Sequence, residues 1–330
     1  ILYMPMQGFW KKLSAQGGSA SGGKKSIMTI APMANVTDAA FRLVLAKYGK
    51  PDVMWTEFVS TDGLTSKGKN NILIDLKFDK SERPIVAQIF GSKPENFYKT
   101  AQLLQELGFD GIDINMGCPD RNVEKQGAGA ALMKNPKLAQ EIIRETMRGA
   151  GKLPVSIKTR IGYNKNELST WLPALLETEP AAIIIHARTR KEMSDVPARW
   201  EHIKDAVKIR DEAKSETLIL GNGDITSYAD GIKKATETGA DGVMVGRGLF
   251  GNPWFFKPDF TSTIENKLLA LVEHTYLFEK MLVEHKSFDI MKKHFKAYVA
   301  GFNCAKELRI KLMETKNSDE VEKIIKEFLD

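Results

Sequence analysis

The stretch "TLILGNGDITSYADGIKKATETGADGVMVGR" at residues 217–247 decides the fold class. It begins and ends with a short apolar run, and the segment between them, 228–239, has the pattern of a helix that ends in glycine. Strand, helix and strand in this order form the unit from which parallel sheets are built. Strands of such sheets are buried on both faces, which explains why both runs are almost continuously apolar.

The same alternation extends over most of the chain. Further apolar runs lie at 27–33, 52–57, 84–90, 111–115, 154–159 and 181–187, and helix-like segments such as 38–48, 94–108 and 136–149 lie between them. Eight strands alternating with helices close a (β/α)8 TIM barrel of about 250 residues. We therefore predict an α/β fold with a TIM barrel; a doubly wound open sheet is the alternative, which the count of eight disfavours.

Three regions follow from this pattern. Residues 1–26 form an N-terminal extension whose segment "SAQGGSASGGKKS" (14–26) has the composition of a flexible linker. Residues 27–260 form the barrel. Residues 261–330 have helical periodicity without strand signals, which predicts a small C-terminal helical domain.

Composition sets the broad class of the protein. The 330 residues are 42% hydrophobic, which supports a sizeable core, and no apolar run approaches the length that crosses a bilayer. The two cysteines, Cys118 and Cys304, do not suggest a disulfide framework. The net charge of +6 is compatible with an RNA partner without requiring one. We expect a soluble cytoplasmic protein that acts as a monomer.

Unusual side chains gather where the predicted strands end. In a TIM barrel these carboxyl ends carry the active site. In strand order they are Pro32, Met33 and Ala34; Glu57; Gln88; Asn115 with Cys118; Lys158 and Arg160; His186 and Arg188; Asn222, Gly223 and Asp224; and Gly246 with Arg247. Such groups at all eight strand ends are hard to explain as packing.

The loops after the last two strands suggest a phosphate site. Gly223 and Gly246 each stand just before a predicted helix start, where glycine permits close approach to exposed backbone N–H groups. Arg247 would add a charged partner. Ordinary turn glycines are the alternative. A phosphate here implies a phosphorylated substrate or a cofactor with a phosphate tail.

The remaining strand-end residues suit a flat ring. Lys158 and His186 can hold its polar edge, Gln88 can bond an amide-like edge, and Pro32–Ala34 can contact its face. This set suits flavin mononucleotide (FMN), although a sugar phosphate would match much of it. The alternative for Lys158 is a structural ion pair with Glu57 or Asp113.

Cys118 lies in the loop "NMGCPD" (115–120), directly after a strand. An unperturbed thiol has a pKa near 8.5 and is protonated at neutral pH, so Cys118 can serve as a general acid; a nucleophile is a second possibility and an inert turn residue a third. Cys304, in an apolar stretch, is interpreted as core. His202, His274, His285 and His294 lack metal-ligand spacing, so no metal site is expected.

Several of these motifs together resemble the tRNA-dihydrouridine synthase family, in the same order along the chain. They are "APMANVTDAAFR", "WTEFVS", "AQIFGSKPENF", "GFDGIDINMGCPDRNVEKQGAGAALMKNP", "SIKTRIG", "IIIHARTR", "NGDI", "GVMVGRGLFGNPW" and, in the tail, "MKKHFKAYVAGFNCAKELRIKLM". The resemblance covers about residues 27–315. Asn35 departs from it, standing where the family more often has glycine or aspartate.

The resemblance implies an FMN-dependent enzyme that reduces the C5–C6 double bond of selected uridines in tRNA, with NADPH as reductant. Hydride would pass from flavin N5 to C6, and Cys118 would protonate C5. The implied FMN contacts are Pro32, Met33, Ala34, Gln88, Lys158, His186, Asn222, Gly223, Asp224, Gly246 and Arg247. Asn115 would read the uracil edge, and the implied substrate-binding residues also include Arg188, Lys292 and Lys296, with residues 261–330 as the RNA-binding domain.

Other functions stay open at this point. An FMN barrel acting on a small molecule, as in a dihydroorotate dehydrogenase-like reaction, would share the flavin site but would not need the basic stretch 292–311. An RNA-binding module that has lost catalysis would keep the barrel without the chemistry. Ribosomal RNA is an alternative substrate to tRNA.

Overall fold

Eight parallel strands form one sheet in the order β1-β8-β7-β6-β5-β4-β3-β2 in the computed structural model, which describes residues 8–15 and 25–330. Their bounds are β1 Ile27–Ile30, β2 Met54–Ser60, β3 Ile85–Phe90, β4 Gly111–Asn115, β5 Val155–Arg160, β6 Ala182–His186, β7 Leu218–Asn222 and β8 Gly242–Val245. The two edge strands meet at a parallel bridge between Thr29 and Val53. This closure confirms the predicted TIM barrel over an open sheet. Of the segment 14–26 that was expected to be flexible, residues 14 and 15 belong to helix α1, Phe9–Ala15, and residues 16–24 lie outside the described residues.

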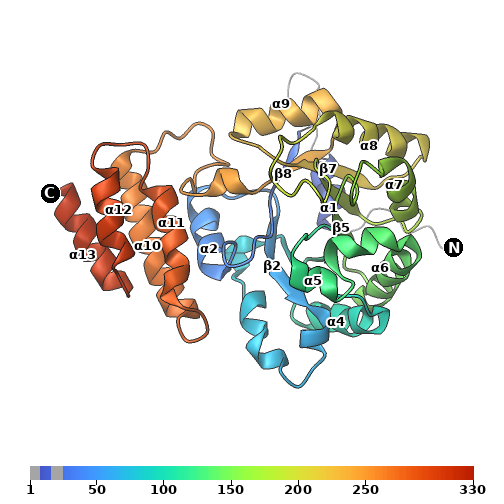
Figure 1. Ribbon diagram of the computed structural model, residues 1–330, viewed down its shortest axis with the longest axis horizontal. Coiled ribbons are helices and arrows are strands. Elements are labelled where there is room, and N and C mark those ends of the chain that lie inside the picture. The colour runs from blue at the N-terminus through green and yellow to red at the C-terminus, as the bar shows by residue number, and fades with distance from the viewer. Residues whose placement is uncertain (1–7, 16–24) are drawn as a thin grey trace.

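Helices surround the sheet, as Figure 1 shows. The helices between strands are α2 Ala39–Tyr48, α3 Thr61–Leu64, α4 Pro94–Glu106, α5 Arg121–Lys125, α6 Pro136–Ala150, α7 Leu168–Leu176, α8 Glu201–Glu212 and α9 Tyr228–Thr238. Short 3-10 helices complete the connections: η1 Lys69–Asn71, η2 Leu73–Leu76, η3 Lys80–Glu82, η4 Gly129–Lys134 and η5 Arg247–Leu249. The helix-like segments identified in the sequence match α2, α4, α6 and α9 closely.

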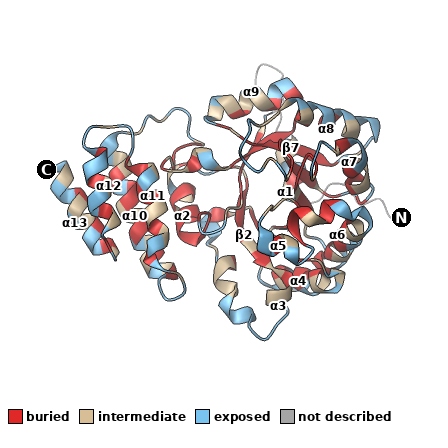
Figure 2. Cartoon of the chain, viewed as in Figure 1, coloured by how far each residue is buried: buried red, intermediate tan, exposed pale blue. Residues whose placement is uncertain are grey.

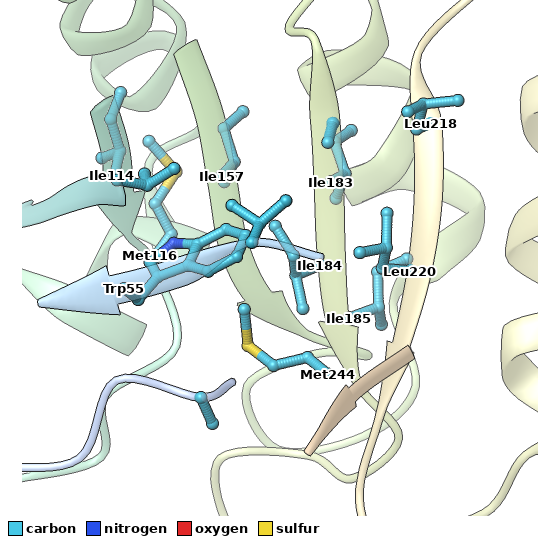
Figure 3. Packing of buried hydrophobic residues seen from close by; sticks show 14 of the residues in the cluster. Trp55, Ile114, Met116, Ile157, Ile183, Ile184, Ile185, Leu218, Leu220 and Met244 are labelled. Carbon is cyan, nitrogen blue, oxygen red and sulfur yellow. The ribbon is translucent and has the colours of Figure 1, made fainter. Parts of the chain in front are cut away.

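The core lies inside the barrel and between the sheet and its helices (Figure 2). Strand β6 illustrates the pattern, because Ile183, Ile184 and Ile185 are all fully buried although they point alternately inward and outward. Figure 3 shows these isoleucines beside Ile157 and Leu220 of the neighbouring strands. Burial on both faces explains the continuous apolar runs and holds the carboxyl ends of the strands on a rigid support.

The amino end of the barrel is covered by a short helix that the sequence pattern did not predict. Helix α1, Phe9–Ala15, buries Trp10 to 1% exposure, and its ring centroid lies 6.0 Å from that of Trp55 in β2. A side chain at Gly111, the first residue of β4, would lie 3.3 Å from the Phe9 ring. The helix therefore packs at the end of the barrel opposite the predicted site.

The C-terminal helices form a separate layer at one end of the molecule (Figure 1). They are α10 Ile264–Leu282, η6 Phe288–Ile290, α11 Met291–Tyr298, α12 Ala305–Met313 and α13 Ser318–Leu329. Their own core includes Leu271, Phe278 and Phe295 and extends to Ala40 of α2. The predicted boundary after residue 260 falls in the connection between η5 and α10. No helix in the described part of the chain is long and apolar enough to cross a membrane.

One prediction about this domain is wrong. Cys304 was expected in the core, but it is exposed and takes a left-handed backbone conformation with φ of 60° just before α12. The apolar stretch around it contributes Tyr298, Val299 and Ala305 to the core instead. A turn between two helices therefore interrupts what looked like one continuous apolar segment.

Candidate active site at the carboxyl rim of the barrel

The strand register brings most of the predicted residues together at the carboxyl rim, defined here by Gln88, Asn115, Cys118, Lys158, His186 and Asn222. Asn115 of β4 is in register with Lys158 of β5, and His186 of β6 with Asn222 of β7. Gln88 of β3 is in register with Asp113 of β4. The backbone ladder therefore fixes which polar side chains are neighbours before any side-chain contact forms.

A chain of hydrogen bonds runs from a buried carboxylate to the cysteine loop. Gln88 Nε2 donates to Asp113 Oδ2 at 2.7 Å, and Asn115 Nδ2 donates to Gln88 Oε1 at 2.9 Å. Asn115 Oδ1 in turn accepts the backbone N–H groups of Gly117 at 3.2 Å and Cys118 at 2.9 Å. Because the carboxylate accepts from Gln88, both amides can take only one orientation.

The hydrogen-bonded series begins at Asp113, which the sequence suggested only as a structural partner of Lys158. It is fully buried, and Ser156 Oγ donates to its second oxygen at 2.6 Å. Burial raises the pKa of Asp113 to about 6, against the lowering effect of the hydrogen bonds from Gln88 and Ser156. In the sequence, only the position of Asp113 indicates this role: it lies two residues before Asn115, on the same face of β4.

The loop that carries Cys118 is held on two sides. Arg160 Nε donates to Gly117 O at 2.8 Å, and Arg160 Nη1 donates to Thr189 O at 3.0 Å, so Arg160 joins this loop to the one after β6. The backbone carbonyl of Cys118 accepts from Ala130 N at 3.0 Å. The thiol is half-buried, and burial raises its pKa. Cys118 is therefore a protonated, positioned thiol at neutral pH.

Lys158 is a cation with little compensation. Burial, helped by the neighbouring Arg160, lowers the pKa of Lys158 to about 8, although Asp113 opposes the shift. Its Nζ donates to Asn222 Oδ1 at 3.2 Å, and Asn222 Nδ2 donates to Met244 O at 2.7 Å. Within residues 8–15 and 25–330 Lys158 has no ion pair, so the alternative of a structural pair with Glu57 or Asp113 is wrong.

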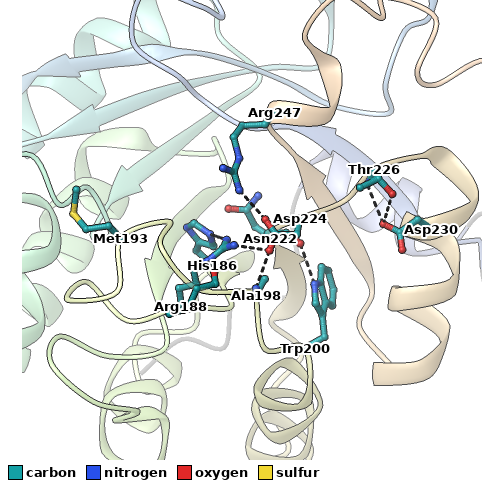
Figure 4. A network of polar contacts seen from close by, with 12 residues as sticks. His186, Arg188, Met193, Ala198, Trp200, Asn222, Asp224, Thr226, Asp230 and Arg247 are labelled. Atoms are coloured by element: carbon teal, nitrogen blue, oxygen red, sulfur yellow. Dashed lines mark hydrogen bonds and ion pairs between the residues drawn. The ribbon is translucent and has the colours of Figure 1, made fainter. Parts of the chain in front are cut away.

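His186 lies against an ionic cluster that Figure 4 shows. Its Nε2 lies 2.9 Å from Arg188 Nη1, which can only donate, so the ring proton is on Nδ1. Burial and the surrounding cations, Lys158 first among them, hold the pKa of His186 well below its ordinary value. His186 is therefore neutral, with Nδ1–H as a donor.

Arg188 lies behind this histidine. It is 2% exposed and donates to Val196 O at 2.5 Å, to His186 and to Asp224. Asp224 also pairs with Arg247 Nη2 at 2.7 Å. Burial acts to raise the pKa of Asp224, but the hydrogen bond from Arg188 and the other contacts lower it below its ordinary value, so Asp224 stays ionised. These contacts favour support of His186 and Arg247 by Arg188 and Asp224 over direct ligand contact.

The loops after β7 and β8 differ in part from the sequence expectation. Helix α9 begins only at Tyr228 and is capped by the Ser227 side chain, and the expected helix after β8 is the three-residue 3-10 helix η5. Neither therefore offers the open helix N-terminus that the phosphate argument assumed.

Gly223 and Gly246, in the loops after β7 and β8, differ in whether packing requires a glycine. Gly223, with φ of 128°, has no room for a side chain, because a Cβ would lie 2.7 Å from that of Ala198. A Cβ on Gly246 would come no closer than 3.6 Å to any neighbour, so packing does not require glycine there. Arg247 beside it is 65% exposed. An open approach next to an accessible guanidinium is what an anionic group needs.

The loop after β1 completes the rim. The backbone N–H of Met33 donates to Thr37 Oγ1 at 2.9 Å, and Pro32 and Ala34 flank it with at least partial exposure. Asn35 has φ of 54°, the left-handed region that asparagine and aspartate tolerate better than most residues. Glycine and aspartate, which the family more often has at this position, also adopt this conformation more readily than most residues.

The predicted RNA-contacting lysines lie on α11, away from the rim network. Lys292 forms an ion pair with Asp289 at 2.5 Å, whereas Lys296 is exposed. Lys293 between them is partly buried, and its charge interacts with Asp38 and Glu57 of the barrel. In the described part of the chain, no group of three or more His, Cys, Asp and Glu side chains is placed to hold a metal ion.

Comparison with known proteins identifies the family. The family model described as dihydrouridine synthase matches residues 29–330. The chain is 40% identical over 326 residues to "Probable tRNA-dihydrouridine synthase 2" of Bacillus subtilis, covering 98% of this chain and 97% of that protein. A probable tRNA-dihydrouridine synthase of Staphylococcus aureus is also 40% identical, over 98% of this chain and 96% of its own length.

Solved structures share the barrel. A 2-naphthoyl-CoA reductase complex superposes with a TM-score of 0.53 at 11% identity, over 75% of this chain and 52% of that one. An amine oxidase acting on 6-hydroxypseudooxynicotine, from Pseudomonas geniculata, gives 0.52 at 12% identity, over 70% and 46%. These likenesses concern the fold, whereas the family match extends through the helical domain. The chain therefore belongs to the dihydrouridine synthase family.

Proposed function

We propose that this protein is an FMN-dependent tRNA-dihydrouridine synthase, which reduces the C5–C6 double bond of selected uridines in tRNA with NADPH. The observation that carries the proposal is the pairing of a protonated, half-buried thiol on Cys118 with a buried cation, Lys158, at one rim of the barrel. A member of the family needs such a pair to protonate one face of a base and to hold an electron-rich ring on the other.

The rim suits a flavin with a phosphate. The Lys158 ammonium has only a neutral amide as hydrogen-bond partner among the described residues, which leaves it free for an electron-rich ring edge. The open space at Gly246 and the exposed Arg247 suit a phosphate. The residues that would hold FMN are Pro32, Met33, Ala34, Gln88, Lys158, His186, Asn222, Gly223, Gly246 and Arg247, with Asp224 acting through Arg247.

The amides of the rim retain donors for a ligand. Gln88 uses one of its two amide hydrogens on Asp113, and Asn115 uses one of its two on Gln88. The second hydrogen of Gln88 can bond the flavin ring, and that of Asn115 can bond a carbonyl of the uracil. Both hydrogens are fixed in direction by Asp113, so the donors are positioned before a ligand binds.

FMN, when bound, would supply the hydride for C6 of the uracil. Cys118 donates the proton to C5 from the opposite face, and the thiolate that forms is stabilised by the nearby charges of Arg160 and Lys158. His186 is kept neutral and offers Nδ1–H as a hydrogen-bond donor. A uridine must leave its stack to reach the rim, as in other enzymes that act on bases.

The tRNA substrate rests on the relatives' names and on the helical domain. Both relatives reported above are named tRNA-dihydrouridine synthases. Lys296 and, in part, Lys292 give α11 a cationic surface suited to phosphates, while Arg188 is assigned to support of His186. Action as a monomer in the cytoplasm is part of the same proposal.

The test is a direct assay. Purified protein is mixed with NADPH and bulk tRNA that lacks dihydrouridine, and the nucleosides are analysed by mass spectrometry. We expect a fraction of uridine to gain the mass of two hydrogens. A yellow protein that oxidises NADPH without this product would contradict the tRNA assignment, and ribosomal RNA and dihydroorotate-type small molecules are then assayed in turn. A parallel series with NADH tests the reductant.

A further inference from the structure

A lysine of the helical domain reaches into the barrel. Lys286 lies between α10 and η6, yet its side chain is only 10% exposed. Its Nζ lies 2.6 Å from Glu57 Oε2 in β2 and 2.7 Å from Asp75 Oδ1 in η2. A charged group this buried needs compensation, and here two carboxylates of the barrel supply it.

Glu57 also contacts the loop that follows β1, and it therefore links Lys286 to that loop. Its side chain is 6% exposed, and its other oxygen, Oε1, accepts the backbone N–H of Asn35. Asn35 has φ of 54°, a conformation that costs free energy in any residue but glycine. The hydrogen bond to Glu57 fixes that peptide, and the residues immediately before it are Pro32–Ala34 of the candidate flavin site.

A second buried carboxylate, Asp38, lies at the end of the loop. Asp38 is 1% exposed and caps α2 by accepting Phe41 N at 2.9 Å. Its Oδ2 has no hydrogen-bond partner in the described part of the chain, and the charges of Lys286 and Arg42 offset part of the rise that burial causes in its pKa. The charge of Lys293 of α11 also interacts with Asp38. The middle of the segment 32–38 is therefore held by the carboxylate of Glu57, its end carries the buried carboxylate of Asp38, and Lys286 of the helical domain interacts with both.

We propose that the helical domain forms part of the flavin site, with Lys286 as a positioning residue that holds the segment 32–38 through Glu57, and with Lys293 adding a weaker electrostatic contribution. The inference rests on the proposed function, because it concerns the group that this loop would contact. Without Lys286, Glu57 and Asp75 would lose the cation that they share, and the two carboxylates would repel each other or move toward water. Either change releases Asn35 and the residues before it.

The helical domain would not be only an RNA-binding attachment, because its removal takes two cations out of the barrel. A truncated protein without residues 262–330 should then lose flavin as well as tRNA affinity. Full-length variants are therefore the right material for a test.

The chain offers a matched control at the opposite end of α2. Lys47 Nζ pairs with Glu273 Oε1 of α10 at 2.7 Å, so this pair also joins the barrel to the helical domain. Lys47 is 58% exposed, and the ten-residue α2 separates it from the loop by about 15 Å. Its removal affects domain contact without affecting Asn35.

The experiment compares Lys286→Met, Lys293→Met and Lys47→Met in the full-length protein. Methionine keeps the length of the lysine stem and removes the charge. Apoprotein is titrated with FMN and the dissociation constant is taken from quenching of flavin fluorescence, while melting is followed by circular dichroism. We expect at least about tenfold weaker FMN binding for Lys286→Met, a smaller loss for Lys293→Met, and no change for Lys47→Met.

A double variant separates positioning from general destabilisation. Glu57→Gln keeps an acceptor for Asn35 N–H and removes the charge that Lys286 balances, so Lys286→Met/Glu57→Gln should recover part of the FMN affinity. Equal FMN affinity for wild type and Lys286→Met would overturn the inference and leave the proposed function intact. A wild-type protein that binds no FMN would overturn the proposed function, and this inference with it.

Discussion

The carboxyl rim of the barrel and the interface between α2 and the helical domain both bury polar side chains, but the hydrogen bonding of these side chains differs. At the rim, the Asn115 side chain alone makes three hydrogen bonds. At the interface, the rings of His274 and His294 are fully buried with centroids 4.6 Å apart, and none of their nitrogens has a partner in the described part of the chain.

This difference indicates two purposes for buried polarity. Amides that are held by several hydrogen bonds point in one direction only, which a reaction centre requires. Unbonded histidines surrounded by Phe41 and Tyr298 act as apolar filling that tolerates a neutral ring but not a charged one. Changes at the rim should therefore alter chemistry with little effect on stability, and changes at the interface should do the reverse.

The largest expected effect is at the rim, for Cys118→Ala. Removal of a general acid lowers turnover by about 10²- to 10⁴-fold, whereas loss of one half-buried thiol changes the free energy of unfolding by less than about 1 kcal/mol. Dihydrouridine formation is measured by mass spectrometry, bound flavin by absorbance, and stability by urea denaturation.

The control for that experiment is Cys304→Ala, which removes the exposed cysteine of the helical domain and should keep the parental rate. Parental turnover in Cys118→Ala would show that the proton comes from another group. Loss of flavin from this variant would show that the loop has a binding role, and it would weaken the contrast drawn between chemistry and stability.

The next effect is at the interface and depends on pH. Burial lowers the pKa of His274 to about 3 and that of His294 well below its ordinary value. An unfolded chain binds a proton at each near pH 6.5, so below that pH the unfolded state holds more protons and the native state loses stability as pH falls. For His274 the loss extends down to about pH 3.

His274→Leu should remove the part of the stability loss at low pH that His274 causes. When the pH falls from about 6.5 to 4.5, a buried neutral histidine lowers the free energy of unfolding by roughly 2 kcal/mol. The free energy of unfolding of the variant should therefore fall by that much less than that of the parent. Urea denaturation at several pH values measures it. His285→Gln, an exposed position on the same domain, should keep the parental acid dependence. An unchanged pH profile in His274→Leu would mean that the folded protein accommodates the charged ring.

The barrel was predictable from the sequence because its determinants are local and repeated. Each strand is an apolar run, each is followed by a helix, and the rule that sites lie at carboxyl ends then brought Gln88, Asn115, Lys158, His186 and Asn222 to one rim. What each side chain does was less predictable. Arg188 and Asp224 were interpreted as ligand contacts, but their bonds to each other and to His186 indicate a supporting role.

The domain interface was not predictable, because its contacts join residues far apart in the sequence. Lys286 and Glu57 are separated by 229 positions, and neither has a local signal for the other. Lys293 belongs to the basic stretch 292–311, yet it is partly buried and its charge interacts with Asp38 and Glu57 of the barrel. Charge counting along a segment cannot show which lysines are already compensated; only packing decides that.

The smallest expected effect concerns the surface beyond that interface, where lysines meet solvent. Lys296 is exposed on α11, whereas Lys292 is paired with Asp289 at 2.5 Å. If Lys296 contacts a tRNA phosphate, Lys296→Ala should lower the slope of log affinity against log salt by about 0.9 and weaken binding a few-fold. Lys292→Ala should do less, because Asp289 already compensates its charge.

Filter binding or anisotropy with labelled tRNA at several salt concentrations measures both variants. Lys214→Ala, which removes an exposed lysine between α8 and β7 at the amino end of the barrel, controls for net charge. Equal slopes for Lys296→Ala and Lys214→Ala would mean that α11 binds no phosphate and that its polar surface is ordinary solvated helix. A lower slope for Lys296→Ala alone would divide α11 by function, with Lys293 facing the barrel and Lys296 facing the RNA.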